Sequence, residues 1–268
     1  MYGKYRKITT LGPKRGICNI CGNSDTLTED HVPPKGSIRV RQVEMFHIVD
    51  ILGVENPPKK KGRKLQDGVK FRTLCPFCNN KRLGLEYDPA LNHFSNIVSS
   101  YLKTSITLPE RLSVNIQPNR VIRAVLGHLL AVSLNCHDLG TMTMAAREYF
   151  LKSVAHFPSG MKIYYWIYPY NKQVLVRDGL LFFCFSKKII RFWLMKYFPL
   201  GFIVTWEQPE EIQSDLECLD FYAGGDINSV VDVPVNLKNI PSPVWPEEPT
   251  DDCAVLYGNR AISAIQKT

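Results

Sequence analysis

The chain contains the run Leu74-Cys75-Pro76-Phe77-Cys78-Asn79-Asn80-Lys81, in which two residues separate a pair of cysteines. A second pair with the same spacing, Cys18 and Cys21, occurs near the N-terminus. A spacer of two residues lets both thiolates of a pair turn toward one ion, and a tetrahedral zinc needs four such ligands. The four cysteines therefore predict one structural Zn²⁺ site.

Two disulfides are the alternative, and they would require an oxidising compartment. No apolar stretch follows the N-terminal residues 1–7, so the sequence does not indicate a signal peptide. Among the other four cysteines, Cys136 and Cys184 sit in apolar surroundings typical of buried free thiols. No apolar run approaches the roughly 18 to 20 residues that a membrane span needs. We therefore expect a cytoplasmic protein with no membrane partner.

Two short strand candidates accompany the cysteine pairs. Residues 27–32 should be extended up to Pro33-Pro34, because proline cannot continue a strand ladder and pushes its predecessor out of the helical region. Residues 70–74 form the second candidate and lead into Cys75. After Cys78 the chain should turn helical through residues 79–83, which gives two strands followed by a helix.

The run Asp30-His31 before Pro33, taken with residues 74–81, resembles the zinc-stapled branch of the HNH (ββα-metal) endonuclease family in its His-Asn-Asn form. The resemblance covers roughly residues 15 to 105. It implies a metal-dependent hydrolase that cleaves DNA phosphodiester bonds, in the company of bacterial restriction and phage-defence nucleases.

The resemblance also implies roles for four residues. His31 matches the general base that takes a proton from the attacking water, and an imidazole titrates near the operating pH. Asp30 and Asn79 match the ligands of the catalytic divalent ion, and their oxygen atoms suit Mg²⁺ or Mn²⁺. Arg82, one turn beyond Asn79, could stabilise the scissile phosphate.

One position departs from the family pattern. The family carries an asparagine on the second strand that orients the base histidine, and Lys70 occupies that place here. Either a backbone carbonyl or another side chain orients His31, or the site is inactive. The alternative function is therefore a catalytically inactive, zinc-stapled protein that binds nucleic acid or a partner protein.

The charge distribution favours a nucleic-acid substrate. The chain has 33 Lys and Arg residues against 25 Asp and Glu residues. Basic side chains near the motif could contact phosphates and displace counterions, although a charged loop that only keeps the protein soluble is the alternative. The residues expected to bind nucleic acid, with DNA as the expected substrate, are Lys35, Lys59, Lys60, Lys61, Arg63, Lys64 and Lys81. Double-strand cleavage by a site with one metal would call for a homodimer or for two successive visits, and a regulatory partner protein could restrain the activity.

Composition and length suggest two domains, with a boundary in the proline-containing segment 107–118. Residues 1–106 would form the nuclease unit, and residues 107–268 an α+β domain for recognition, regulation or oligomerisation. Its expected helices cover residues 119–134 and 141–154. Its expected antiparallel strands cover residues 162–168, 173–176, 180–185, 189–196 and 202–206, with edge strands at 219–223 and 230–235. The fold class expected for the whole chain is α+β.

Two side chains have structural explanations. Asp88-Pro89 is typical of a helix N-cap followed by proline at the first helical position, although Asp88 could also approach the metal. His128 lies within the apolar segment 121–134, where a core histidine with satisfied hydrogen bonds is the common explanation.

Overall fold

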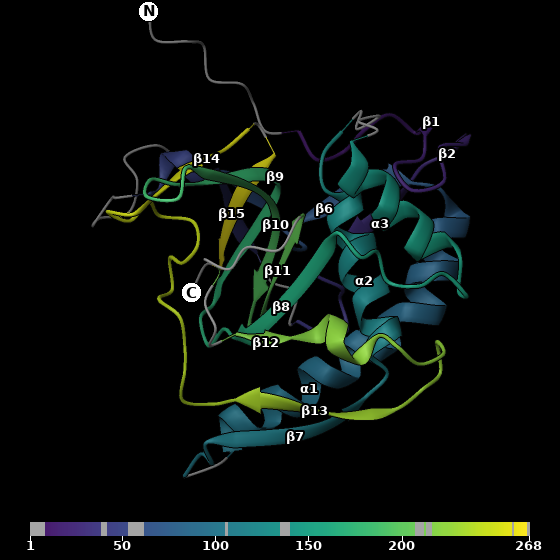
Figure 1. The fold of residues 1–268 in the computed structure, drawn as a ribbon. Coiled ribbons are helices and arrows are strands. Elements are labelled where there is room, and N and C mark those ends of the chain that lie inside the picture. Colours follow the sequence, from purple (N-terminus) through teal and green to yellow (C-terminus); the bar gives the residue numbers. More distant parts are fainter. Residues whose placement is uncertain are drawn as a thin grey trace, which may run out of the picture.

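The computed structural model describes residues 9–38, 42–52, 62–104, 107–134, 140–206, 212, 216–258 and 260–266. Within these ranges the chain combines helices with antiparallel strands (Figure 1). The predicted mixture of helix and sheet is therefore confirmed.

The strands are β1 Arg15–Ile17, β2 Ser24–Thr26, β3 Thr28–His31, β4 Val43–His47, β5 Arg63–Leu65, β6 Lys70–Leu74, β7 Arg111–Ile116, β8 Met161–Ile167, β9 Lys172–Phe183, β10 Lys188–Tyr197, β11 Leu200–Trp206, β12 Glu217–Cys218, β13 Val231–Asn236, β14 Cys253–Leu256 and β15 Ala261–Gln266. The helices are α1 Asp88–Thr104, α2 Pro118–Ala131 and α3 Thr141–Leu151, the π-helix η2 Phe77–Tyr87, and the 3₁₀ turns η1 Ile48–Asp50 and η3 Leu219–Tyr222.

The largest layer is a nine-stranded sheet with the order β12-β8-β11-β10-β9-β15-β4-β5, in which β14 also pairs with β9. Four strands, β8 to β11, occupy the segment where the sequence predicts five. The difference lies at Asp178-Gly179, predicted as a turn, through which β9 continues. Asp178 has a φ of 61° at an irregularity in the pairing with β10, and Trp193 Nε1 donates to its carboxylate at 2.9 Å. A β-bulge thus accommodates the turn signal without ending the strand.

Other strands differ from the sequence-based expectation. The predicted edge strand at residues 219–223 is wrong, because residues 219–222 form the 3₁₀ turn η3. The segment 107–118, expected as a boundary loop, contains β7, which pairs with β13 in a separate two-stranded sheet. Strands β4, β5, β14 and β15 were not anticipated, since each is short or joins the sheet only through partners distant in sequence.

Helix α2 is buried along nearly its whole length, as its apolar faces predict. It packs against α1, α3 and η2, and also against β9 and β10. Because the last carbonyls of a helix lack partners within it, other groups must satisfy them. Asn19 Nδ2 donates to Leu130 O at 3.1 Å, and Thr73 Oγ1 donates to Ala131 O at 2.8 Å. These bonds attach the first cysteine pair and strand β6 to the C-terminal end of α2.

The predicted boundary near residue 107 falls between α1 and β7. Strands β4 and β5, from the N-terminal side of that boundary, nevertheless extend the sheet formed by the C-terminal part. One hydrophobic cluster likewise takes residues from both sides, among them Leu74 and Phe94 with Val125 and Trp193. The two predicted parts therefore share a sheet and a core. None of the helices in the described ranges is long and apolar enough to cross a membrane.

Candidate functional site

The four cysteines of the two pairs come together near the C-terminal end of α2. Their Sγ atoms all lie within 4.8 Å of one another. Gly22 has a φ of 78°, a conformation that favours glycine, in the turn that follows the first pair. In the second pair, Cys75 directly follows β6 and Cys78 lies in the first turn of η2. All four cysteines are free thiols, so the alternative of two disulfides among them is not observed in the structure.

The geometry of the cluster fits a tetrahedral metal site. With zinc–sulfur bonds of about 2.3 Å, the sulfur atoms around one zinc would stand about 3.8 Å apart. Cys21 Sγ and Cys75 Sγ are separated by 3.7 Å. The cluster could therefore bind a metal such as zinc, and it is the one group of this kind in the described part of the chain.

The pKa values of these thiols are also compatible with metal binding. A hydrogen bond from the Cys78 side chain lowers the pKa of Cys18 to about 5, whereas that bond and burial raise the pKa of Cys78. Burial raises the pKa of Cys75 to about 11. The thiolate form of Cys18 is therefore favoured, and a bound dication would also favour the thiolate forms of Cys75 and Cys78.

The predicted strand pair and helix lie next to the cysteine cluster. β3 and β6 pair antiparallel, with Asp30 opposite Phe71 and His31 opposite Lys70. Asn79, in the first turn of η2, turns its side chain toward β3. Its Nδ2 donates to Thr28 Oγ1 at 2.9 Å and to the Glu29 carbonyl at 3.1 Å. Since these bonds use the amide nitrogen, the amide oxygen is the atom that could ligate an ion.

Asp30 is 5% exposed and forms part of a buried chain of charged groups. Its Oδ2 lies 3.0 Å from His128 Nδ1, and His128 Nε2 lies 2.9 Å from Asp88 Oδ1. We call Asp30, His128 and Asp88 the buried triad. It joins strand β3, helix α2 and helix α1. Neither His128 nor Asp30 reaches solvent appreciably, so this contact is internal to the fold.

The two carboxylates favour the protonated form of His128. A neutral imidazole donates through only one nitrogen, whereas here both ring nitrogens face carboxylate oxygens at hydrogen-bonding distance. Burial alone would lower the pKa of His128, but the charges of Asp30 and Asp88 outweigh it and raise the pKa to about 10. His128 is thus a satisfied core histidine, as expected, and it is also bonded to the predicted metal ligand Asp30.

Asp88 does not begin an isolated helix, contrary to the N-cap interpretation. The π-helix η2 leads directly into α1, and the Asp88 amide donates to the Leu83 carbonyl within that continuous helix. The next residue, Pro89, has no amide proton to donate. The change from π-helical to α-helical hydrogen-bond spacing at this position therefore costs no backbone hydrogen bond. The Asp88 side chain is consequently available to His128.

His31 has a carboxylate neighbour that the sequence analysis did not identify. Its Nε2 lies 3.4 Å from Asp67 Oδ2, and Lys70 forms an ion pair with the same carboxylate. The hydrogen bond from Lys70 is the main reason that the pKa of Asp67 is lowered, with a further contribution from His31. Lys70, in the place of the family asparagine, thus positions an anion beside His31.

Arg82 lies apart from the β3 contact of Asn79. Its guanidinium donates to Glu86 at 2.7 Å and to the Leu151 carbonyl at 3.4 Å. In a π-helix the hydrogen bonds join residues five apart, so a residue three positions after Asn79 does not lie on the same face. Arg82 therefore faces the end of α3.

The predicted nucleic-acid contacts occupy several elements. Lys35 is exposed in the loop after β3, and Lys81 is exposed on η2. Arg63 and Lys64 belong to β5, the edge strand of the large sheet. Lys59, Lys60 and Lys61 lie outside the described residues, as does Cys136. Cys184, expected as a buried thiol, is exposed instead, because it follows the end of β9.

Comparison of the chain with models of protein families, with curated proteins and with solved structures finds no match. The functional argument therefore depends on the chemistry and geometry of this chain's own residues.

We expect the purified protein to carry about one zinc per chain, and Cys21→Ser to lose it. Because metal binding at such sites contributes folding free energy, the midpoint of thermal unfolding should fall by roughly 10 °C. Elemental analysis and thermal denaturation measure the two effects. The matched control is Cys184→Ser, which should change neither. Equal loss of zinc in both variants would contradict the assignment. So would a zinc-free wild-type protein with an unchanged unfolding midpoint.

We also expect a specific pH dependence of stability. The pKa of folded His128 is raised above its ordinary value of 6.5, so its stabilising contribution should be complete below pH 6.5 and disappear as the pH rises through about 10. His128→Asn should lower the free energy of unfolding by about 3 to 5 kcal/mol at pH 6, as removal of one member of a buried ion pair does.

The measurement is urea unfolding of zinc-saturated protein between pH 6 and pH 10, with exposed His156→Asn as the control. The gap between wild type and His128→Asn should narrow with rising pH. A gap that stays constant across this range would show that His128 is not the cation described above.

Proposed function

We propose that this protein is a metal-dependent endonuclease of the HNH (ββα-metal) type that hydrolyses phosphodiester bonds in DNA. The observation that carries the proposal is the contact between Asn79 and the backbone of β3. That contact brings an amide side chain to the strand carrying Asp30 and His31, one residue before the aspartate. The proposal is supported by the occurrence of a carboxylate, an imidazole and an amide on one strand pair and the helix that follows it.

The oxygen donors fit a hard divalent cation. The second carboxylate oxygen of Asp30 and the amide oxygen of Asn79 would hold Mg²⁺ or Mn²⁺, with water and substrate phosphate completing the coordination. When bound, such an ion supplies positive charge to the phosphate and to the leaving oxygen. The protein's own part is to fix the ligands: His128 orients Asp30, and Thr28 with the Glu29 carbonyl orients Asn79.

His31 would act as the general base. The carboxylate of Asp67, held by Lys70, lies 3.4 Å from Nε2 without a hydrogen bond to it, and its negative charge would favour the tautomer that carries the proton there. Nδ1 is then the nitrogen that accepts a proton from the attacking water. In this account Asp67 performs the orienting role that the family gives to an asparagine on the second strand.

A second candidate function is a zinc-stapled binding protein with no catalysis. The burial of Asp30 favours it, because one carboxylate oxygen already accepts a hydrogen bond from His128 and the residue is only 5% exposed. Such a protein would bind nucleic acid or a partner protein without cleaving either. The two candidates differ in whether His31 is required for a chemical step.

We expect the zinc-loaded protein to nick supercoiled plasmid DNA when Mg²⁺ or Mn²⁺ is added, and His31→Ala to lower the rate by at least about 100-fold, the usual contribution of a general base. Gel electrophoresis of the relaxed and linear products measures the rate. Omission of the divalent ion is preferable to a chelator, because a chelator would also remove metal from the cysteine cluster.

Exposed His156→Ala is the matched control and should cleave like the wild type. DNA binding by His31→Ala, measured by electrophoretic mobility, should be retained. If wild type and His31→Ala bind DNA equally and neither cleaves it, the binding-protein function holds and the nuclease proposal is wrong.

A further inference from the structure

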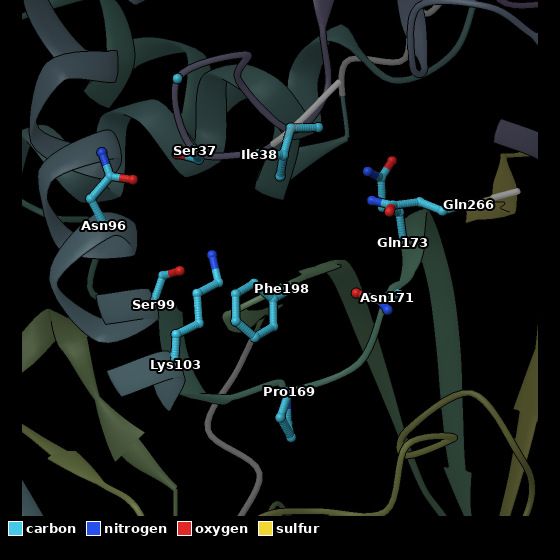
Figure 2. A pocket seen from close by; sticks show the side chains of 11 residues that line it. Ser37, Ile38, Asn96, Ser99, Lys103, Pro169, Asn171, Gln173, Phe198 and Gln266 are labelled. Atoms are coloured by element: carbon cyan, nitrogen blue, oxygen red, sulfur yellow. The ribbon is translucent and has the colours of Figure 1, made fainter. Parts of the chain in front are cut away.

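A cavity of about 660 Å³ opens between α1, the ends of β9 and β15, and the loop that follows the β3 strand. This volume lies within the roughly 300 to 1,000 Å³ typical of small-molecule sites. Figure 2 shows residues of α1 on one side of it and glutamine side chains from the sheet on the other. The lining residues used below are Asn96, Lys103, Asn171, Gln173, Phe198 and Gln266.

Four carboxamide side chains face this cavity, those of Asn96, Asn171, Gln173 and Gln266. None of them makes a side-chain hydrogen bond to any other residue that the structure describes. Gln173 is the most telling, because it is 3% exposed and its Oε1 is buried without a partner. Buried polar atoms are normally hydrogen-bonded, so an unpaired acceptor beside a cavity indicates a ligand that donates to it.

The charge of the lining restricts the ligand. Among the described residues that line the cavity, Lys103 is the one charged side chain, and no described carboxylate lies within ion-pair distance of it. Its Nζ lies 5.0 Å from the centroid of the Phe198 ring. The described part of the lining contains no aspartate or glutamate. The described lining therefore favours a ligand with an anionic group near Lys103.

A carboxamide presents a donor and an acceptor side by side, which matches the paired donor and acceptor of an adenine edge. Guanine is read most often by arginine or lysine and adenine by asparagine or glutamine, and the described lining residues include four carboxamides, one lysine and no arginine. The Phe198 ring offers a surface on which a base could stack. We propose that this cavity binds an adenine nucleotide, with the carboxamides on the base and Lys103 on the phosphate. The proposal does not depend on nuclease activity.

Calorimetric titration of the full chain, zinc-loaded and without Mg²⁺, tests the proposal. Adenosine 5′-monophosphate should bind at one site, and Lys103→Ala or Asn171→Ala should each weaken the binding by about tenfold or more, the effect of losing one charge-assisted or well-formed hydrogen bond. Both test residues are exposed, and their thermal unfolding should match that of the wild type. Exposed Lys14→Ala is the matched control and should bind normally.

Further probes decide which part of the nucleotide is recognised and where it comes from. Guanosine 5′-monophosphate and ribose 5-phosphate should bind at least about tenfold more weakly than the adenine nucleotide. Binding of a deoxyadenylate hexamer alone, weakened by the same two variants, would mean that the adenine nucleotide belongs to a nucleic-acid strand. The proposal is overturned if neither adenine probe binds saturably, if ribose 5-phosphate binds equally well, or if the pocket variants bind like the wild type.

Discussion

The buried triad of Asp30, His128 and Asp88 is the interaction on which the arrangement of the candidate site depends. It ties β3, which carries Asp30 and His31, to the central helix α2 and to the helix that follows the second cysteine pair. Because the imidazolium lies between two carboxylates in the protein interior, removing His128 would leave both carboxylates without their cation. Strands β3 and β6 are thus anchored, through α2, in the same core that supports the large sheet.

The cysteine cluster and the buried triad hold elements that contact one another. Asn19 attaches the first cysteine pair to the end of α2, and Thr73 attaches β6 one position further along that helix. Asn79 then connects the start of η2 back to β3. A metal bound by the four cysteines would hold the first cysteine pair at a fixed distance from β6 and η2. His128 in turn fixes the side chain of Asp30. The proposed ligands of the catalytic ion are therefore set by two independent constraints.

Local signals in the sequence predicted the parts of this structure that depend on neighbouring residues. The two-residue spacing of the cysteines, the prolines after His31 and the apolar faces of α2 each identified an element correctly. The contacts that complete the site could not be predicted in this way. His128 is separated from Asp30 by 98 positions, and nothing in the pattern around His128 indicates a charged partner. Asp67 reaches His31 only because β6 pairs with β3, and the continuous helix that frees Asp88 for His128 overrides a common N-cap signal.

The most direct test of this account is the position of a divalent cation in crystals of His31→Ala soaked with Mn²⁺. Anomalous diffraction locates manganese and zinc separately. The account predicts manganese within about 2.5 Å of a carboxylate oxygen of Asp30 and the amide oxygen of Asn79, the usual range of such bonds. Metal found only among the four cysteines, with Asp30 and Asn79 both remote from any ion, would contradict it.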